Sequence, residues 1–122
     1  MMKKIMIVDD SPTILKVLKR YLLNSGYEVE TIVDSATFFD GRVEAFKPDL
    51  FIIDINMPQY DGYYILENIK KQGLCPDAKV IMCSTKFFEQ DKARARELGA
   101  DDFLVKPFSD KEMIAKIAGM IG

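Results

Sequence analysis

Histidine is absent from this 122-residue chain, and cysteine occurs only twice. The lack of histidine excludes Ser-His and Cys-His catalysis, the usual zinc sites and phosphohistidine chemistry within the chain. The two cysteines, Cys75 and Cys83, form no CxxC pair. In a reducing cytoplasm they are most simply structural thiols, and we assign them no function. Any chemistry must therefore use carboxylates, hydroxyl groups and lysine.

Long apolar runs and an excess of charge of one sign are also absent. The longest apolar runs, such as Leu50 to Ile53, are far too short to span a bilayer, and no signal peptide is visible. Lys plus Arg number 17 and Asp plus Glu 19, a net charge of -2, so no basic field attracts nucleic acid or anionic lipid. We expect a cytoplasmic domain without membrane insertion or direct nucleic-acid binding.

The length and residue balance are those of one soluble globular domain, which we expect to span residues 1–122. Hydrophobic residues make up 48% and charged residues 30% of the chain. Short apolar segments at 5–8, 28–32, 50–53, 80–83 and 103–105 alternate with segments of helical periodicity. This pattern predicts an α/β fold with a single doubly wound, five-stranded parallel sheet in the flavodoxin-like order 2-1-3-4-5.

Helices are predicted between and after these strands. The first begins at the cap Ser11 and ends before Gly26. Its predicted inner face consists of Ile14, Leu15, Leu18, Tyr21 and Leu22. The second runs from about Ser35 to Pro48 and contains Gly41, which weakens its regularity. The other three are expected at 62–72, at 89–98 and after the cap Ser109.

Polar side chains follow four of the predicted strands, at the edge of the sheet where such folds bind ligands. They are Asp9, Asp10, Asp54, Ser84, Thr85 and Lys106. Three carboxylates in one crevice repel one another, so either one takes a proton or a hard cation joins them. Oxygen ligands favour Mg²⁺, with Mn²⁺ as the alternative, and Asp9 and Asp10 would form the metal-binding pair.

Asp54 ends the central apolar strand, LFIID, and is followed by a loop. A carboxylate can attack phosphorus and form an aspartyl phosphate when a metal and a cation neutralise the developing charge. Lys106 is a mobile point charge, suited to pairing first with a carboxylate and then with a phosphoryl oxygen. Ser84 offers a hydroxyl donor to another phosphoryl oxygen. Asp54 is therefore the predicted nucleophile.

Four segments, IMIVDDSPT, LFIIDINMPQYDG, VIMCST and FLVKPF, resemble the signature segments of response-regulator receiver domains, the CheY-like switches of two-component signal transduction. The resemblance runs the whole length of the chain and keeps the family's order and approximate spacing. It implies that Asp54 is phosphorylated, that Asp10 binds Mg²⁺ directly, and that Asp9 does so directly or through water. The backbone carbonyl of Asn56 would be a further metal ligand.

The resemblance also implies the parts of a switch. Ser84 would take the place of the switch hydroxyl residue, Lys106 that of the phosphate-binding lysine, and Phe103 that of the aromatic residue whose rotation reports phosphorylation. Phosphorylation would then change the face formed by the fourth helix, the fifth strand and the fifth helix. We expect this face to control an output domain or a downstream target protein.

The implied function is a phosphorylation-dependent signalling switch rather than an enzyme, with self-phosphorylation and slow autodephosphorylation as its only reactions. The phosphoryl donor would be the phosphohistidine of a sensor histidine kinase or phosphotransfer protein, or a small acyl phosphate. We expect a monomer and leave a phosphorylation-dependent dimer open. The choice between a stand-alone regulator and the receiver of a longer protein is also open.

Some of these residues have simpler structural interpretations. Thr85 would be the switch hydroxyl if its strand ended one position later, but the spacing to Asp54 and Lys106 favours Ser84. Thr85 and Lys86 could also narrow access to the phosphoryl group. Phe103 could be an ordinary core aromatic residue. Asp9 and Asp10 could merely cap the first helix. The peptide bond before Pro107 could be cis or trans. Turn or solvated roles are expected for Asp61, Lys92, Arg94, Arg96, Asp101 and Asp102.

Two other classes of function share parts of this pattern. A flavodoxin-like redox carrier needs a phosphate-binding loop rich in Ser, Thr and Gly after the first strand, where this chain has Asp9 and Asp10. A magnesium phosphohydrolase with an aspartyl-phosphate intermediate would place its nucleophile after the first strand, beneath a separate cap domain. Here Asp54 follows the third predicted strand, and no insertion is long enough for a cap.

Overall fold

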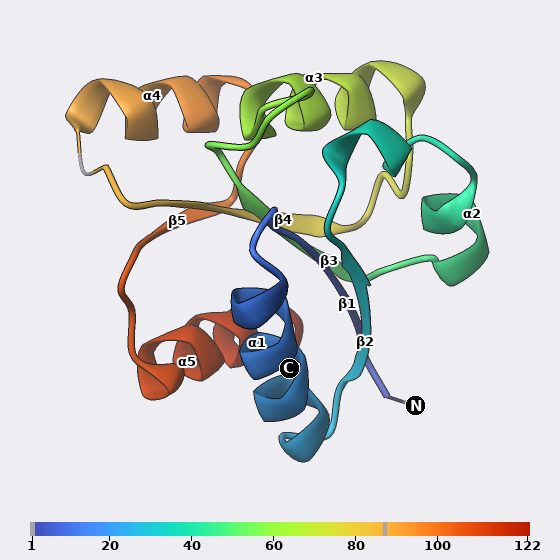
Figure 1. The fold of residues 1–122 in the computed structure, drawn as a ribbon, viewed down its shortest axis with the longest axis vertical. Helices are drawn as coiled ribbons and strands as arrows, with labels where there is room; N and C mark the ends of the chain where they lie inside the picture. Colours follow the sequence, from blue (N-terminus) through green and yellow to red (C-terminus); the bar gives the residue numbers. More distant parts are fainter. Residues whose placement is uncertain (1, 87) are drawn as a thin grey trace.

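The computed structural model describes residues 2–86 and 88–122, and within them the strands form one five-stranded parallel sheet in the order β2-β1-β3-β4-β5 (Figure 1). The strands are β1 (Lys4–Val8), β2 (Glu28–Ile32), β3 (Leu50–Asp54), β4 (Lys79–Ser84) and β5 (Asp102–Val105). The helices are α1 (Pro12–Asn24), the 3-10 helix η1 (Ser35–Thr37), α2 (Arg42–Phe46), α3 (Gly62–Gln72), α4 (Glu89–Glu97) and α5 (Asp110–Ile121). The predicted fold class and strand order are confirmed.

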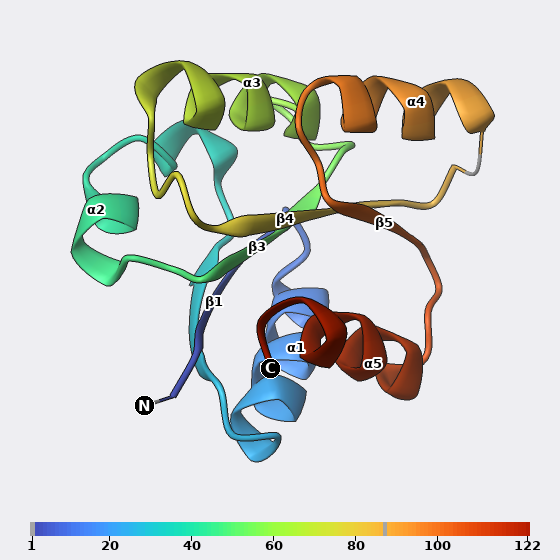
Figure 2. The same ribbon diagram turned by 180° about the vertical axis from the view of Figure 1, so that it is seen from behind.

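Different helices cover the two faces of the sheet. In both views α2, α3 and α4 lie on one face and α1 and α5 on the other (Figures 1 and 2). Each face has its own apolar core, the first containing Phe51 and Met82 and the second Ile52 and Leu104. Every residue of β3 is buried, as expected for a parallel strand covered on both sides. No helix within the described ranges combines the length and apolar character of a bilayer span.

Two expectations about the helices are wrong. The helix predicted from about Ser35 is divided into η1 and the short α2, because Gly41 has a φ of 101°, outside the right-handed helical region. Tyr21, predicted on the inner face of α1, is 36% exposed, whereas the leucines of that face are buried. Its hydroxyl group favours the solvated margin of the helix over the core.

The acidic pair Asp101 and Asp102 is solvent-accessible, as expected, and also contributes to the fold. The Asp101 carboxylate accepts a hydrogen bond from the backbone N–H of Val80 at 2.8 Å. The Asp102 carboxylate lies 3.1 Å from Nζ of Lys116 in α5. These contacts connect the start of β5 to β4 and to α5.

Candidate functional site

An acidic cluster lies at the carboxyl ends of β1 and β3, which are neighbours in the sheet. The carboxylates of Asp9, Asp10 and Asp54 each offer an oxygen within 4.8 Å of the others. Asp9 and Asp54 are 3% and 7% exposed, whereas Asp10 is open to solvent. Asp9 Oδ1 also accepts the backbone N–H of Ser11 at 2.9 Å, but the residue that caps α1 is Ser11 itself, whose side chain accepts the N–H of Ile14. The structure thus brings together the three acids that the sequence placed at one edge.

Lys106, the residue after β5, brings a cation to this cluster. Its Nζ lies 2.6 Å from Asp9 Oδ2 and 3.5 Å from Asp54 Oδ1. Burial acts to lower the pKa of Lys106, but the hydrogen bond to Asp9 and the charge of Asp54 outweigh burial, so the pKa is raised. The backbone N–H of Lys106 donates to the Ser84 carbonyl at 2.8 Å, and the Lys106-Pro107 peptide is cis. The lysine is therefore held as a cation between two buried carboxylates.

The pKa of Asp54 is raised from 3.8 to about 6. Burial is the largest cause, and the charges of Asp9 and Asp10 add to it, while Lys106 and a backbone hydrogen bond from Asn56 lower the pKa. Three ionised carboxylates and one ammonium group also leave this crevice with an excess of negative charge. A divalent cation would compensate this charge, and a set of oxygen donors is what Mg²⁺ prefers. The residues present therefore fit a magnesium ion.

Ser84 ends β4, and its side chain is buried next to the loop that follows Asp54. Its Oγ accepts hydrogen bonds from Asn56 Nδ2 at 3.1 Å and from the backbone N–H of Lys86 at 3.0 Å. These contacts use the oxygen as an acceptor and leave the hydroxyl proton for another partner. Thr85 is exposed. Of the two neighbouring hydroxyl groups, Ser84 is the one that contacts the Asp54 loop.

The loop between β3 and α3 is closed tightly behind Asp54. The backbone N–H of Gly62 donates to the Ile55 carbonyl at 2.8 Å. A Cβ added at Gly62 would lie 2.6 Å from the Asp54 carbonyl oxygen and 2.8 Å from Ile55 Cα, too close for any other residue without movement of the backbone. Asp61 caps α3 by accepting the N–H of Tyr64 at 2.9 Å, which agrees with its expected role as a turn residue.

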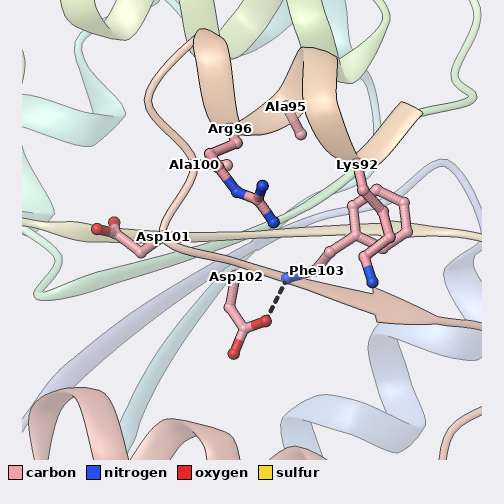
Figure 3. A pocket seen from close by; sticks show the side chains of 7 residues that line it. All are labelled: Lys92, Ala95, Arg96, Ala100, Asp101, Asp102 and Phe103. Atoms are coloured by element: carbon pink, nitrogen blue, oxygen red, sulfur yellow. Dashed lines mark hydrogen bonds between the residues drawn. The ribbon is translucent and has the colours of Figure 1, made fainter. Parts of the chain in front are cut away.

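Phe103 lies half-buried in β5 and packs against the core beneath α3 and α4. Figure 3 shows its ring and the Lys92 side chain in a small pocket between α4 and β5. At about 130 Å³, this pocket is smaller than the roughly 300 Å³ at which small-molecule sites begin. Phe103 is thus placed at the boundary between α4 and β5.

A contact between α3 and α4 was not among the predicted features. The buried Tyr63 donates its hydroxyl to Asp91 of α4, 3.0 Å from the carboxylate and 3.3 Å from the backbone carbonyl. The guanidinium of Arg94, expected to be simply solvated, lies 4.1 Å from the centre of the Tyr63 ring. Within α4 only Ala95 is buried, so these contacts add to a small apolar attachment. A tyrosine on a buried helix face was the available signal, because its hydroxyl needs a polar partner.

Comparisons with known proteins agree on one family. The profile of the response regulator receiver domain matches residues 5–118. The transcriptional regulatory protein YxdJ of Bacillus subtilis is 39% identical over 120 residues, which are 98% of this chain and 51% of that protein. The structure of the chemotaxis protein CheY4 of Vibrio cholerae has a TM-score of 0.92 at 27% identity, covering 99% of this chain and 100% of that one.

A second solved structure, the beryllofluoride-activated receiver domain of DrrB, has a TM-score of 0.86 at 30% identity and covers 99% of this chain and 98% of its own. The chain spans about half the length of the curated relatives it matches. The profile covers nearly the whole chain, and the same fold recurs in separate receiver domains. The chain therefore belongs to the response regulator receiver domain family of two-component signal transduction.

Proposed function

We propose that this receiver domain is a phosphorylation switch in which the carboxylate of Asp54 accepts the phosphoryl group. Receiver domains are signalling switches rather than conventional enzymes, and they bind Mg²⁺ at an acidic pocket. The observation that carries the proposal is the position of Asp54. It is buried at the end of the central strand, grouped with two other acids and 3.5 Å from the Lys106 ammonium.

In the proposed reaction an oxygen of ionised Asp54 attacks the phosphorus of a phosphohistidine in a sensor kinase or phosphotransfer protein. As the new P–O bond forms, the P–N bond breaks, its electron pair returns to the imidazole, and the ring takes up a proton. With acetyl phosphate as donor, a P–O bond breaks instead and acetate leaves. Water then hydrolyses the aspartyl phosphate slowly, releasing inorganic phosphate and restoring Asp54.

The proposed metal ligands are Asp10, Asp54, the backbone carbonyl of Asn56 and, directly or through water, Asp9. When bound, Mg²⁺ or Mn²⁺ supplies positive charge that neutralises the oxygens of the transferring group. The protein's own contribution is to hold these oxygen donors in one crevice. Asp9 is fixed there by its contact with Lys106. Asp10 is exposed, so its side chain can adjust its position to the bound metal ion.

Lys106 and Ser84 are the proposed partners of the phosphoryl oxygens. Lys106 is already within reach of Asp54 and would exchange a carboxylate for a phosphoryl oxygen. The hydroxyl proton of Ser84 would bind another oxygen, drawing the end of β4 toward the site. Because α4 follows β4 directly in the chain, this movement would reach the face of α4, β5 and α5, where Phe103 would rotate inward.

We further propose that the receiver spans residues 1–122, acts in the cytoplasm, and controls a partner through the face of α4, β5 and α5. The curated relatives matched over half their length are named transcriptional regulatory proteins, which favours an output domain in a longer protein. CheY4, matched over its whole length, favours a stand-alone regulator. In either case we expect a monomer before phosphorylation, with dimerisation after phosphorylation as the alternative.

Intact mass after incubation with MgCl₂ and acetyl phosphate or phosphoramidate tests the chemistry. We expect a single phosphate adduct that is absent from Asp54→Asn and from samples containing EDTA. Asp77→Asn, at an exposed carboxylate, is the matched control and should form the adduct normally. An adduct that persists in Asp54→Asn, or no adduct under any of these conditions, would contradict the proposal.

A further inference from the structure

Ser35, the first residue of η1, is a buried polar residue with an unusual pair of partners. Only 2% of its surface is exposed. Its hydroxyl donates to the carbonyl of Pro58 at 2.6 Å and accepts the backbone N–H of Tyr60 at 3.0 Å. Both partners belong to the loop between Asp54 and α3. One side chain thus satisfies two main-chain groups of that loop at once.

Elsewhere the hydrogen bonds of the loop lie near its ends, while the side chains of Met57 and Tyr60 pack against the core and Tyr60 stacks on Tyr64. The Gly62 N–H to Ile55 carbonyl bond closes it, and the side chain of Asn56 is bound to Ser84. Its middle contains Gln59 in the left-handed region, with a φ of 69°, a conformation that costs a non-glycine residue free energy and needs support from its surroundings. The Ser35 hydroxyl bonds to the residues on both sides of Gln59.

Ser35 follows β2, and the end of β2 is bonded to the first acid of the cluster. The backbone N–H of Asp9 donates to the Ile32 carbonyl at the end of β2, at 3.1 Å. Asp34 then caps η1 by accepting the N–H of Ala36 at 3.0 Å, and Thr37 Oγ1 donates to the Asp34 carbonyl at 2.8 Å. The hydroxyl of Ser35 therefore sits on a short, capped turn attached to the same sheet edge as Asp9.

We propose that Ser35 is a positioning residue for the metal and phosphoryl site, acting by bracing the loop that carries Asn56. This inference rests on the proposed function, in which the backbone carbonyl of Asn56 binds the metal ion. A hydroxyl is suited to this place, since it both donates and accepts. If Ser35 supported only the fold, its loss would lower stability without changing the affinity of the site for Mg²⁺.

The test compares Ser35→Ala with Ser35→Thr, which keeps the hydroxyl, and with Thr37→Val, which weakens the same turn without touching the loop. Titration with MgCl₂, followed by amide NMR shifts of the site, gives the dissociation constant without any phosphorylation. We expect Ser35→Ala to raise it about tenfold, the low end of what loss of an outer-shell partner costs. Ser35→Thr should recover most of the affinity, and Thr37→Val should match wild type.

Phosphorylation rates over a range of Mg²⁺ concentrations provide the second readout. Ser35→Ala should need more Mg²⁺ to reach half its maximal rate, while the rate at saturation falls much less. An unchanged dissociation constant in Ser35→Ala, or an equal loss in Thr37→Val, would overturn the inference. If the wild type binds Mg²⁺ but never forms a phosphate adduct, the proposed function is contradicted. The Mg²⁺ titration would still decide the role of Ser35.

A measurement on the wild type covers the case in which Ser35→Ala does not fold. Hydrogen exchange at the amide of Tyr60 reports how often its bond to Ser35 opens. We expect saturating MgCl₂ to slow this exchange, because metal binding to the Asn56 end of the loop and the Ser35 brace would support each other. Exchange at Tyr60 that is unaffected by Mg²⁺ would contradict the coupling.

Discussion

Replacing Asp54 by Asn should stabilise the metal-free protein at neutral pH. The folded-state pKa of Asp54 is raised from 3.8 to about 6, chiefly by burial. A rise in pKa from 3.8 to about 6 corresponds to about 3 kcal/mol against the ionised carboxylate. Asparagine has nearly the same shape and no charge. We therefore expect the free energy of unfolding to rise by about 1 to 3 kcal/mol near neutral pH.

The sign of the pH dependence follows from proton binding. An acid whose pKa is raised on folding holds more protons in the folded than in the unfolded state between the two pKa values. The contribution of Asp54 to stability is thus fully present below pH 3.8 and is lost as the pH rises through about 6. The advantage of Asp54→Asn should accordingly be near zero in acid, grow across this window and then stay constant.

Urea unfolding in EDTA, followed by circular dichroism across this pH range, measures the difference. The control Asp77→Asn, at an exposed carboxylate, should differ from wild type by no more than about 0.5 kcal/mol. Mg²⁺ at ten times its dissociation constant should then stabilise the wild type by about 1.4 kcal/mol and the variant by less. A variant less stable than wild type at neutral pH, or a difference independent of pH, would refute the reasoning.

Three further substitutions test other parts of the site. Lys106→Met removes the cation that lowers the pKa of Asp54, so the pKa of Asp54 should rise above 6 in a ¹³C NMR titration. An unchanged value would contradict the ion pair. Tyr63→Phe loses the hydrogen bond to Asp91, which should lower the free energy of unfolding by about 1 kcal/mol and speed hydrogen exchange in α4. Unaltered exchange in α4 would count against the contact. Gly62→Ala should lower the free energy of unfolding by about 1 to 3 kcal/mol through overpacking and should slow phosphorylation. The control Gly119→Ala has open space around it and should have neither effect. Equal stability of the two variants in urea would disprove the steric argument.

The sequence was sufficient to predict where the acidic cluster would form. Consecutive apolar residues such as Leu50–Ile53 mark buried parallel strands, and such strands end at a common edge. The polar residue at the end of each strand is then placed by topology alone, which is why the sequence groups Asp9, Asp54 and Lys106 at one edge. The strands also agree with the prediction to within one residue at each end.

Features that depend on long-range side-chain contacts could not be predicted in this way. That Lys106 lies nearer to Asp9 than to Asp54 is a matter of rotamers within one crevice. Ser35 was expected only as the start of a helix, because its partners lie 23 and 25 residues away in the chain. The break at Gly41 was visible as a weak point, but propensity does not show whether a helix bends or ends there.

Locating the phosphoryl group tests the central claim most directly. Borohydride reduces an aspartyl phosphate to homoserine, so reduction of the phosphorylated protein followed by peptide sequencing by mass spectrometry identifies the acceptor. We predict homoserine at position 54 and unmodified residues at Asp9, Asp10 and Ser84. Homoserine at one of the other two acids, or a phosphate that survives reduction as an ester on Ser84, would contradict the assignment of Asp54 as the phosphoacceptor.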